Sequence, residues 1–283
     1  MKKQIYAVII ILTLASFACS FQNYRMETID AQWVNVNEAL PKDVESVELV
    51  FRMTGGKFLL TPGSEGLVNG HIAYNIQQWE PEFIRRDQYL EIKQSNPWRV
   101  TGLPTSDVEN NWELAITETL PLSITIEGGA SENDFDLTGL QLTDLRIVQG
   151  ASDTKIRFDT PNPQTIERFI FTTGASSAKL TGLGNANFKQ MTMSGGAGDY
   201  TLDFNGTFQQ DAVVDIKTGI SNITIILPAE LKAIVNNNGT VTNINTRGTW
   251  LVTDNTYTTL SEGFTLTINL DMAVGNVTLV HDE

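Results

Sequence analysis

The stretch LRIVQGASDTKIRF (residues 145–158) decides the fold of this chain, because it contains a strand, a corner and a second strand. Apolar and polar residues alternate on both sides of Gly150 and Ala151, as they do in strands with one buried face. Six further segments repeat this pattern: LSITIEGGASENDFDL (122–137), FIFTTGASSAKL (169–180), MTMSGGAGDYTLDF (191–204), VDIKTGISNITIIL (214–227), AIVNNNGTVTNIN (233–245) and LTINLDMAVGNVTLV (266–280).

The spacing of the corners indicates how the segments are arranged. Glycines 129, 150, 174, 196, 219 and 239 follow one another at intervals of 21, 24, 22, 23 and 20 residues. An interval of about 22 residues is the length of a solenoid coil and is too long for a hairpin. No stretch has the spacing, cap and stop signal of a long helix. The sequence therefore predicts an all-β stack of coils.

The corner residues have a structural explanation. Glycine adopts backbone angles that side chains forbid, and the small residue beside it lets successive coils approach closely. We therefore expect these glycines to shape the coil and not to contact a ligand.

The first 18 residues have the pattern of an export signal. Met1-Lys2-Lys3 is basic, residues 5–15 form an apolar run too short to span a bilayer comfortably, and small residues follow. We predict a signal peptide at residues 1–18.

Cys19 is the one cysteine of the chain and directly follows this signal. The stretch LASFAC (14–19) resembles a lipobox, in which the cysteine becomes the acylated N-terminus; Ala18 fits this pattern, and Ser16 and Phe17 depart from it. An ordinary signal peptidase that cuts after Ala18 is the alternative. A lone exported cysteine beside the cleavage point is better explained by lipid than by a disulfide, so we predict lipid attachment at Cys19.

The remaining chain divides into three regions. Residues 19–43 are mixed and polar and are predicted to be a tether. Residues 44–120 begin the β-structure, since VESVELVFRMTGGKFLL (44–60) has the strand, corner, strand pattern around Gly55-Gly56. Residues 121–283 hold the repeated coils and are expected to continue the preceding region.

A family resemblance rests on motifs that keep their order and spacing over more than a hundred residues. These motifs are VEL (47–49) before Gly55-Gly56, GHIAYN (70–75), NWEL (111–114), LPLSI (120–124), GGA (128–130), DLTGL (136–140) and LRIVQGA (145–151). This run closely resembles the N-terminal domain of the bacterial toast-rack family. The C-terminal part, especially LTI (266–268) through VGNV (274–277), is similar to the β-solenoid parts of adhesin-like proteins. The resemblance implies a right-handed parallel β-solenoid, and it brings no catalytic residues.

Three acidic residues form the strongest candidate for a metal site. Glu132, Asp134 and Asp136 stand at every second position and would share one face of a strand. Such oxygen ligands could hold calcium. The simpler interpretation is the solvent face of an alternating strand, with Phe135 and Leu137 pointing inward, and we predict no metal site.

Other kinds of chemistry have little support. His71 and His281 are the two histidines, and their spacing resembles no metal motif. We expect His71 to be a surface or rim residue, and we predict no cofactor. A net charge of −14 argues against nucleic acid as a partner. Parallel β-helices also include polysaccharide-active enzymes, but no groove of carboxylates is readable here.

An insertion interrupts the last repeat. Gly239 and Gly275 are 36 residues apart, and the extra length carries Trp250, Leu251 and Tyr257. We predict that Trp250 and Tyr257 form a structural cap over the end or side of the terminal coils, with Trp250 against Ile244 or Val252. The alternative is a long solvent-exposed loop.

These observations favour an exported protein, lipid-anchored at the cell membrane or cell surface, that acts as a non-enzymatic adhesion or interaction module. Its expected partners are membrane lipid and an unknown protein or glycan. A regulatory module that binds a membrane signalling partner under envelope stress is the alternative, by analogy of fold alone. A polysaccharide-active enzyme is a remote alternative.

Overall fold

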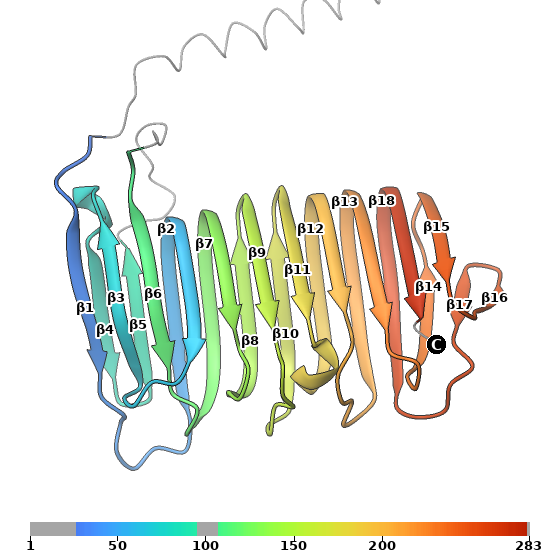
Figure 1. The fold of residues 1–283 in the computed structure, drawn as a ribbon, viewed down its shortest axis with the longest axis horizontal. Helices are drawn as coiled ribbons and strands as arrows, with labels where there is room; N and C mark the ends of the chain where they lie inside the picture. Colours follow the sequence, from blue (N-terminus) through green and yellow to red (C-terminus); the bar gives the residue numbers. More distant parts are fainter. Residues whose placement is uncertain (1–26, 95–106, 282–283) are drawn as a thin grey trace, which may run out of the picture.

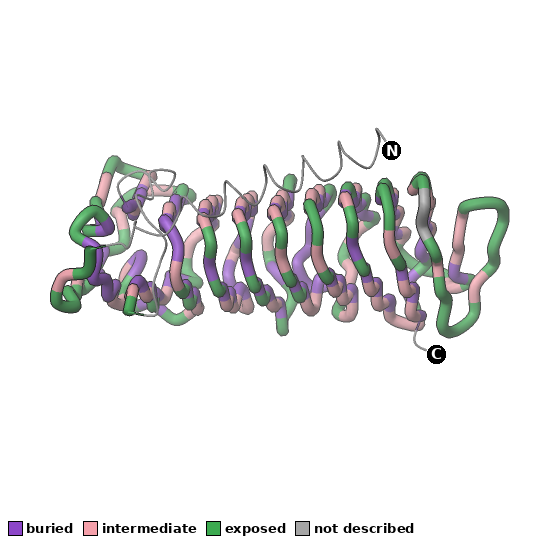
Figure 2. The backbone as a smooth tube through the Cα atoms, turned by 90° about the horizontal axis from the view of Figure 1, so that it is seen from above, coloured by how far each residue is buried: buried purple, intermediate pink, exposed green. Residues whose placement is uncertain are grey.

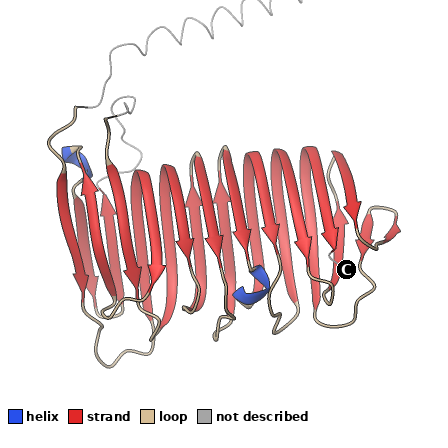
Figure 3. Ribbon diagram, viewed as in Figure 1, coloured by secondary structure: helices blue, strands red, loops and turns tan. Residues whose placement is uncertain are grey.

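The computed structural model describes residues 27–94 and 107–281, and this part of the chain consists mostly of strands (Figure 3). Two short 3-10 helices, η2 (Gln77–Trp79) and η3 (Leu183–Ala186), lie between strands. The strands are β1 (Gln32–Glu38), β2 (Val47–Pro62), β3 (Val68–Tyr74), β4 (Pro81–Arg86), β5 (Tyr89–Gln94), β6 (Asn110–Ile116), β7 (Pro121–Asp136), β8 (Gln141–Gln149), β9 (Ser152–Arg157), β10 (Ile166–Thr173), β11 (Ser176–Thr181), β12 (Phe188–Asp203), β13 (Ala212–Leu227), β14 (Lys232–Asn237), β15 (Val241–Arg247), β16 (Leu251–Thr253), β17 (Thr256–Thr258) and β18 (Thr265–His281). The predicted all-β class is confirmed.

Each coil contributes one strand segment to each of two layers. Strands β2, β7, β12, β13 and β18 are 16 or 17 residues long and contribute to both layers. In the remaining coils the corner separates two short strands, as in β8 and β9, β10 and β11, or β14 and β15. We call the layer that holds β8, β10 and β14 the first layer, and the layer that holds β9, β11 and β15 the second layer.

Neighbouring coils pair in parallel and keep a constant register. The two layers run side by side as an elongated stack (Figures 1 and 2). One inward row of the first layer passes through eight paired strands: Leu49, Ile124, Leu145, Phe169, Met191, Val214, Ile268 and Val235. All of these side chains are buried, so the core is a continuous apolar strip between the layers. A right-handed winding of the coils stays a prediction.

The order of the coils in space differs from their order in sequence at both ends. Strand β18 pairs with β13 on one side and with β14 and β15 on the other, so the last repeat lies between two earlier ones (Figure 1). Similarly, β2 pairs with β7 on one side and with β5 and β6 on the other. The repeat pattern predicts the coils but not the positions of β18 and β2 within the stack.

The corner glycines stack on one another along the coils. A Cβ atom added at Gly150 would lie 2.8 Å from the carbonyl oxygen of Gly129, and one added at Gly174 would lie 2.9 Å from that of Gly150. Gly196 and Gly219 repeat the same approach, at 2.9 and 2.8 Å. The backbone of each coil therefore occupies the space that a side chain in the next coil would need.

The N-terminal end is built from antiparallel strands. In the second layer β3 pairs with β6 and β1 pairs with β3, while in the first layer β4 pairs with β5. The tether predicted for residues 19–43 is therefore wrong for Gln32–Glu38, which is part of the sheet. Val36 is buried there, and only two apolar residues point inward between polar ones, so the sequence signal of this strand is weak.

Candidate interaction face

The outer side of the second layer carries regular rows of side chains, because alternate residues of each strand point outward. One row passes through Lys57, Glu132, Asp153, Ser177, Asp199, Asn222, Asn276 and Asn243. The next row passes through Leu59, Asp134, Lys155, Lys179, Thr201, Thr224, Thr278 and Asn245. Paired strands lie about 4.8 Å apart, so the rows present chemical groups at a fixed interval over the length of the stack.

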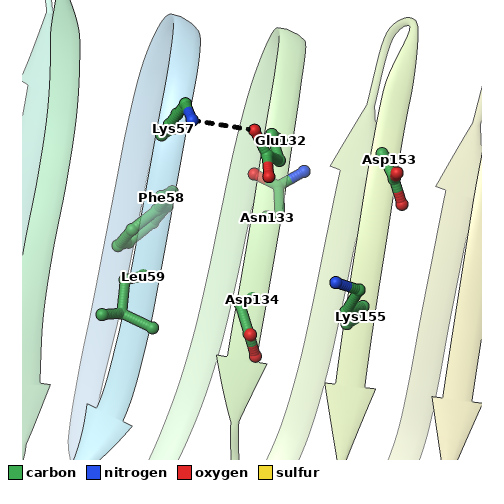
Figure 4. A pocket seen from close by; sticks show the side chains of 8 residues that line it. All are labelled: Lys57, Phe58, Leu59, Glu132, Asn133, Asp134, Asp153 and Lys155. Carbon is green, nitrogen blue, oxygen red and sulfur yellow. Dashed lines mark ion pairs between the residues drawn. The ribbon is translucent and has the colours of Figure 1, made fainter.

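A shallow hollow of about 150 Å³ interrupts this face between β2, β7 and β9 (Figure 4). Its lining carries two lysines and three carboxylates around the apolar side chain of Leu59, which is 38% exposed. The charged lining residues are Lys57, Glu132, Asp134, Asp153 and Lys155. Such a lining can bind a partner that carries both charges or many hydroxyl groups.

The three candidate metal ligands lie on this outer face, and each forms an ion pair with a basic side chain of a neighbouring coil. Glu132 pairs with Lys57 at 3.2 Å, and Arg157 pairs with Asp134 at 3.1 Å and with Asp136 at 2.9 Å. The carboxylates therefore point to cations on both sides of β7. In the described part of the chain, no three His, Cys, Asp or Glu side chains gather as metal ligands would.

The surroundings of Asp136 shift its pKa. Partial burial opposes its ionisation, but hydrogen bonds from Thr138 and Arg157 outweigh this effect and lower the pKa of Asp136 below its ordinary value. The backbone N–H of Thr138 donates to Asp136 Oδ1 at 3.1 Å. Asp136 therefore stays ionised on the surface and fixes the guanidinium of Arg157.

Sequence reasoning did not identify Lys57, Leu59, Asp153 and Lys155 as parts of this hollow. The glycine alignment contains a signal for two of them, because the step of 21 residues from Gly129 to Gly150 also separates Glu132 from Asp153 and Asp134 from Lys155. In the structure both pairs are register partners.

Towards the C-terminal end, amides replace the charges. We call Asp199, Asn222, Asn276 and Asn243 the second-layer amide row. Each asparagine donates its Nδ2 to the Oδ1 of the preceding member, at 2.8, 2.9 and 3.4 Å in that order. A first-layer amide row consists of Asp215, Asn269 and Asn236, with bonds of 2.9 and 3.0 Å. The side chains in each row therefore point the same way along the stack.

The two histidines lie at opposite ends of the stack. Half-buried His71 lies 3.5 Å from Glu113 and its ring centroid is 5.2 Å from that of Trp33. His281 is buried, and its Nε2 lies 3.1 Å from the carbonyl oxygen of Ala229. His71 is therefore at the rim, as predicted.

The insertion forms a hairpin, in which β16 pairs with β17 and β17 pairs with β14 (Figure 1). Tyr257 lies opposite Val235, and both Tyr257 and Trp250 are partly buried against the core. The ring centroid of Trp250 is 6.0 Å from that of His281, and its Nε1 donates to the carbonyl oxygen of Arg247 at 3.0 Å. The capping role of Trp250 and Tyr257 stays a prediction. The predicted lipid site, Cys19, lies outside the described residues.

One family model matches most of the chain. The N-terminal domain of toast_rack, DUF2154, matches residues 21–170 and 162–226. No helix in the described residues has both the length and the apolar character that crossing a membrane requires. No curated protein matches the chain.

Two solved structures align with most of this chain. One is a "putative cell adhesion protein" from Clostridium sporogenes, with 19% identity, a TM-score of 0.49, and alignment over 90% of this chain and 100% of that one. The other is a "putative adhesin" from Parabacteroides merdae, with 7% identity, a TM-score of 0.34, and alignment over 90% of this chain and 96% of that one.

Proposed function

The chain belongs to the toast-rack family, and from this premise we propose that it is an exported, lipid-anchored envelope protein that binds other molecules without catalysing a reaction. Adhesion at the cell surface is the leading form of this role. We also propose that the coils form a right-handed solenoid, since connections between parallel strands are right-handed in almost all known cases.

One observation carries the binding role, namely the regular outer face of the second layer. Its rows pass through the same eight coils, and the hollow between β2, β7 and β9 gives it a local recognition point. A face with a fixed repeat suits an extended partner, such as a glycan or an extended polypeptide, because equivalent contacts can recur at each coil.

The position of Cys19 supports the anchor. Diacylation at the mature N-terminus would hold the protein at a membrane, since more than one acyl chain is needed for stable attachment. Replacing the cysteine, Cys19→Ala, should release the protein into the soluble fraction of a bacterial host and abolish incorporation of labelled fatty acid. Ser20→Ala, which keeps the thiol, is the matched control. A soluble wild-type protein with a free N-terminal thiol, found by mass spectrometry, would show that the anchor is wrong.

A pair of charge reversals tests the binding face. Lys155 lies in the hollow on the second layer, whereas Lys217 is exposed on the outer side of the first layer. We expect Lys155→Glu to weaken the binding of purified residues 20–283 to isolated bacterial envelopes by roughly tenfold, because it replaces one of the two lysines in the lining of the hollow with a fourth carboxylate. Lys217→Glu should bind like wild type. Equal binding by both variants would exclude the hollow, and release of sugar fragments from the envelopes would favour the enzyme alternative.

A further inference from the structure

The C-terminal end of the stack is stepped. The first layer extends beyond β14 through β17 and then β16, whereas the second layer ends at β15 in the part of the chain that the structure describes. Figure 1 shows the hairpin beyond β14 and β15, and Figure 2 shows the corresponding loop projecting from that end. The step leaves room for two strands beside β15, opposite β17 and β16.

The floor of the step is apolar. Directly opposed residues of antiparallel strands share a face, so Tyr257 and Val252 lie on the same side of the first layer as the buried Val235. Val252 is nevertheless 51% exposed. This inward side of the hairpin therefore has apolar surface and no second layer above it.

The inward residues of β15 indicate the same opening. One inward row of the second layer passes through Leu60, Phe135, Ile156, Leu180, Leu202, Ile225 and Leu279, all at most 1% exposed. Its next member is Thr246, which is exposed, and Ile244 beside it is only half-buried. The core is therefore incomplete next to β15.

The backbone of β15 has hydrogen-bonding groups that face the step. Thr240 donates its N–H to the carbonyl oxygen of Met272, on β18. The direction of the backbone N–H and C=O groups alternates from residue to residue along a strand. The backbone groups of Ile244 and Thr246 therefore face β18, while those of Asn243 and Asn245 face away from it. The indole of Trp250 donates to the Arg247 carbonyl on that outer edge. The backbone N–H and C=O groups of Asn243 and Asn245 therefore form an edge with which another strand can pair.

The amide rows end differently in the two layers. In the first layer, the hydroxyl of Thr256 on β17 donates to Asn236 Oδ1 at 3.2 Å and so completes the row. In the second layer, Asn243 donates to Asn276, and no side chain in the described residues donates to Asn243 Oδ1. The acceptor points toward the position where a strand equivalent to β17 would lie.

A second copy of this chain does not fit the step. If β15 paired with β15 of another copy and both first layers lay on the same side, each hairpin would occupy the place of the other copy's β14. If the first layers lay on opposite sides, neither copy would cover the Tyr257 and Val252 side chains of the other. If the copies joined through β16, the second layers would be separated by several empty strand positions. The occupant must therefore be thinner than a whole stack end.

We propose that the step binds an extended strand of a partner protein, which pairs with the open edge of β15 and covers Tyr257 and Val252 with apolar side chains. A hydroxyl or amide side chain of this strand donates to Asn243 Oδ1. The exposed guanidinium of Arg247, two rows further along the same outer face, selects a carboxylate in the partner strand. This docking site is separate from the hollow on the second layer and does not depend on it.

A peptide and two matched variants test the docking site. The probe is a labelled peptide that copies residues 273–281 with Val280→Glu, so that an asparagine lies opposite Asn243 and a carboxylate lies opposite Arg247. Asn245→Pro removes an edge N–H and places a ring in the path of the added strand, whereas Asn245→Ala keeps the N–H. We expect binding of the peptide to residues 20–283, measured by fluorescence anisotropy, to fall at least roughly tenfold in Asn245→Pro and to persist in Asn245→Ala.

The controls separate docking from misfolding and from self-association. Both variants should keep the wild-type circular dichroism spectrum and melting curve, and a scrambled peptide should not bind. Equal binding to both variants, or no binding to wild type, overturns the proposal. Dimers in sedimentation that Asn245→Pro abolishes, without peptide binding, also overturn it and assign the edge to a second copy.

Discussion

In the N-terminal half of the stack, neighbouring coils are joined at the surface by opposite charges, whereas the C-terminal coils are joined by asparagine amides. All ion pairs in the described part of the chain lie between residues 38 and 189. The amide rows begin at Asp199 and Asp215. An ion pair needs two residue types in register, while an amide both donates and accepts, so a single residue type can repeat from coil to coil.

The two ends of the stack also differ in whether an ion pair joins the layers. At the N-terminal end, buried Glu38 of the second layer forms an ion pair with Arg85 of the first layer, and Phe83 packs against the core beside them. This pair joins the two layers and closes the end. At the N-terminal end the second layer extends one strand beyond the first, whereas at the C-terminal end the first layer extends two strands beyond the second. No ion pair bridges the two layers at the C-terminal end in the described residues. A row of amides ends in an acceptor that one more amide can use, whereas the Glu38–Arg85 ion pair is complete with two members.

Removing the hairpin should have the largest effect on this contrast. Deletion of residues 251–258, with a short Gly-Ser connection, would expose the edge of β14 next to that of β15. We expect larger species at raised concentration, measured by light scattering. Leu251→Ser with Val252→Ser, which keeps both strands, is the control and should stay monomeric. A deletion variant that is monomeric and melts like wild type would leave Trp250 and Tyr257 without a capping role.

Core truncations at the two ends should differ strongly in cost. Phe58 is buried, and its ring makes edge contacts with Phe51, Trp112 and Phe135. Phe58→Ala should lower the free energy of unfolding by about 3–5 kcal/mol. Ile244→Ala, in the half-buried last coil, should cost only about 1 kcal/mol. Urea denaturation measures both, and similar losses would mean that the C-terminal end is as well closed as the N-terminal end.

A corner substitution compares the middle of the stack with β18. Gly150→Val places a Cβ atom about 2.8 Å from the Gly129 carbonyl oxygen and should cost about 1–3 kcal/mol. Ala273, which lies opposite Gly219 in the register of β18, already carries a Cβ atom and is exposed. Ala273→Val should stay within about 0.5 kcal/mol. Equal melting temperatures for the two variants would contradict a structural role of the corner glycines.

The smallest expected effect is a change in how the stability of the protein depends on pH. The pKa of Asp136 is lowered in the folded chain, so its stabilising contribution is present above the unfolded pKa and is lost as the pH falls through the folded value. Asp136→Asn should cost less than about 1 kcal/mol at neutral pH and reduce the loss of stability between about pH 5 and about pH 2. Asn276→Ala, in the second-layer amide row, removes hydrogen bonds to Asn222 and Asn243 only and should leave that pH dependence unchanged. Urea midpoints that shift in parallel for both variants would remove the distinction.

The sequence was sufficient to predict the period, the corners and the outward position of Glu132, Asp134 and Asp136, because alternation and glycine spacing are local properties. It was not sufficient to predict β1, because polar residues surround its two inward valines and the alternation is short. It was also not sufficient to predict the ion pairs, which depend on the register between strands. The place of β18 between β13 and β14 could not be predicted, because every repeat carries the same pattern and so fits beside any other. The step beside β15 could not be predicted either, because it depends on the pairing of β17 with β14.

The place of β18 also determines when the C-terminal end can assemble during synthesis. Strands β14 and β15 leave the ribosome before β18, yet β18 supplies their parallel partner. At ordinary rates of translation, the delay between Arg247 and His281 is on the order of a few seconds. During that time these strands have no neighbour in their final position, so a nascent chain of this protein cannot complete its coils in the order in which they are translated, and a chaperone has an interval in which to bind.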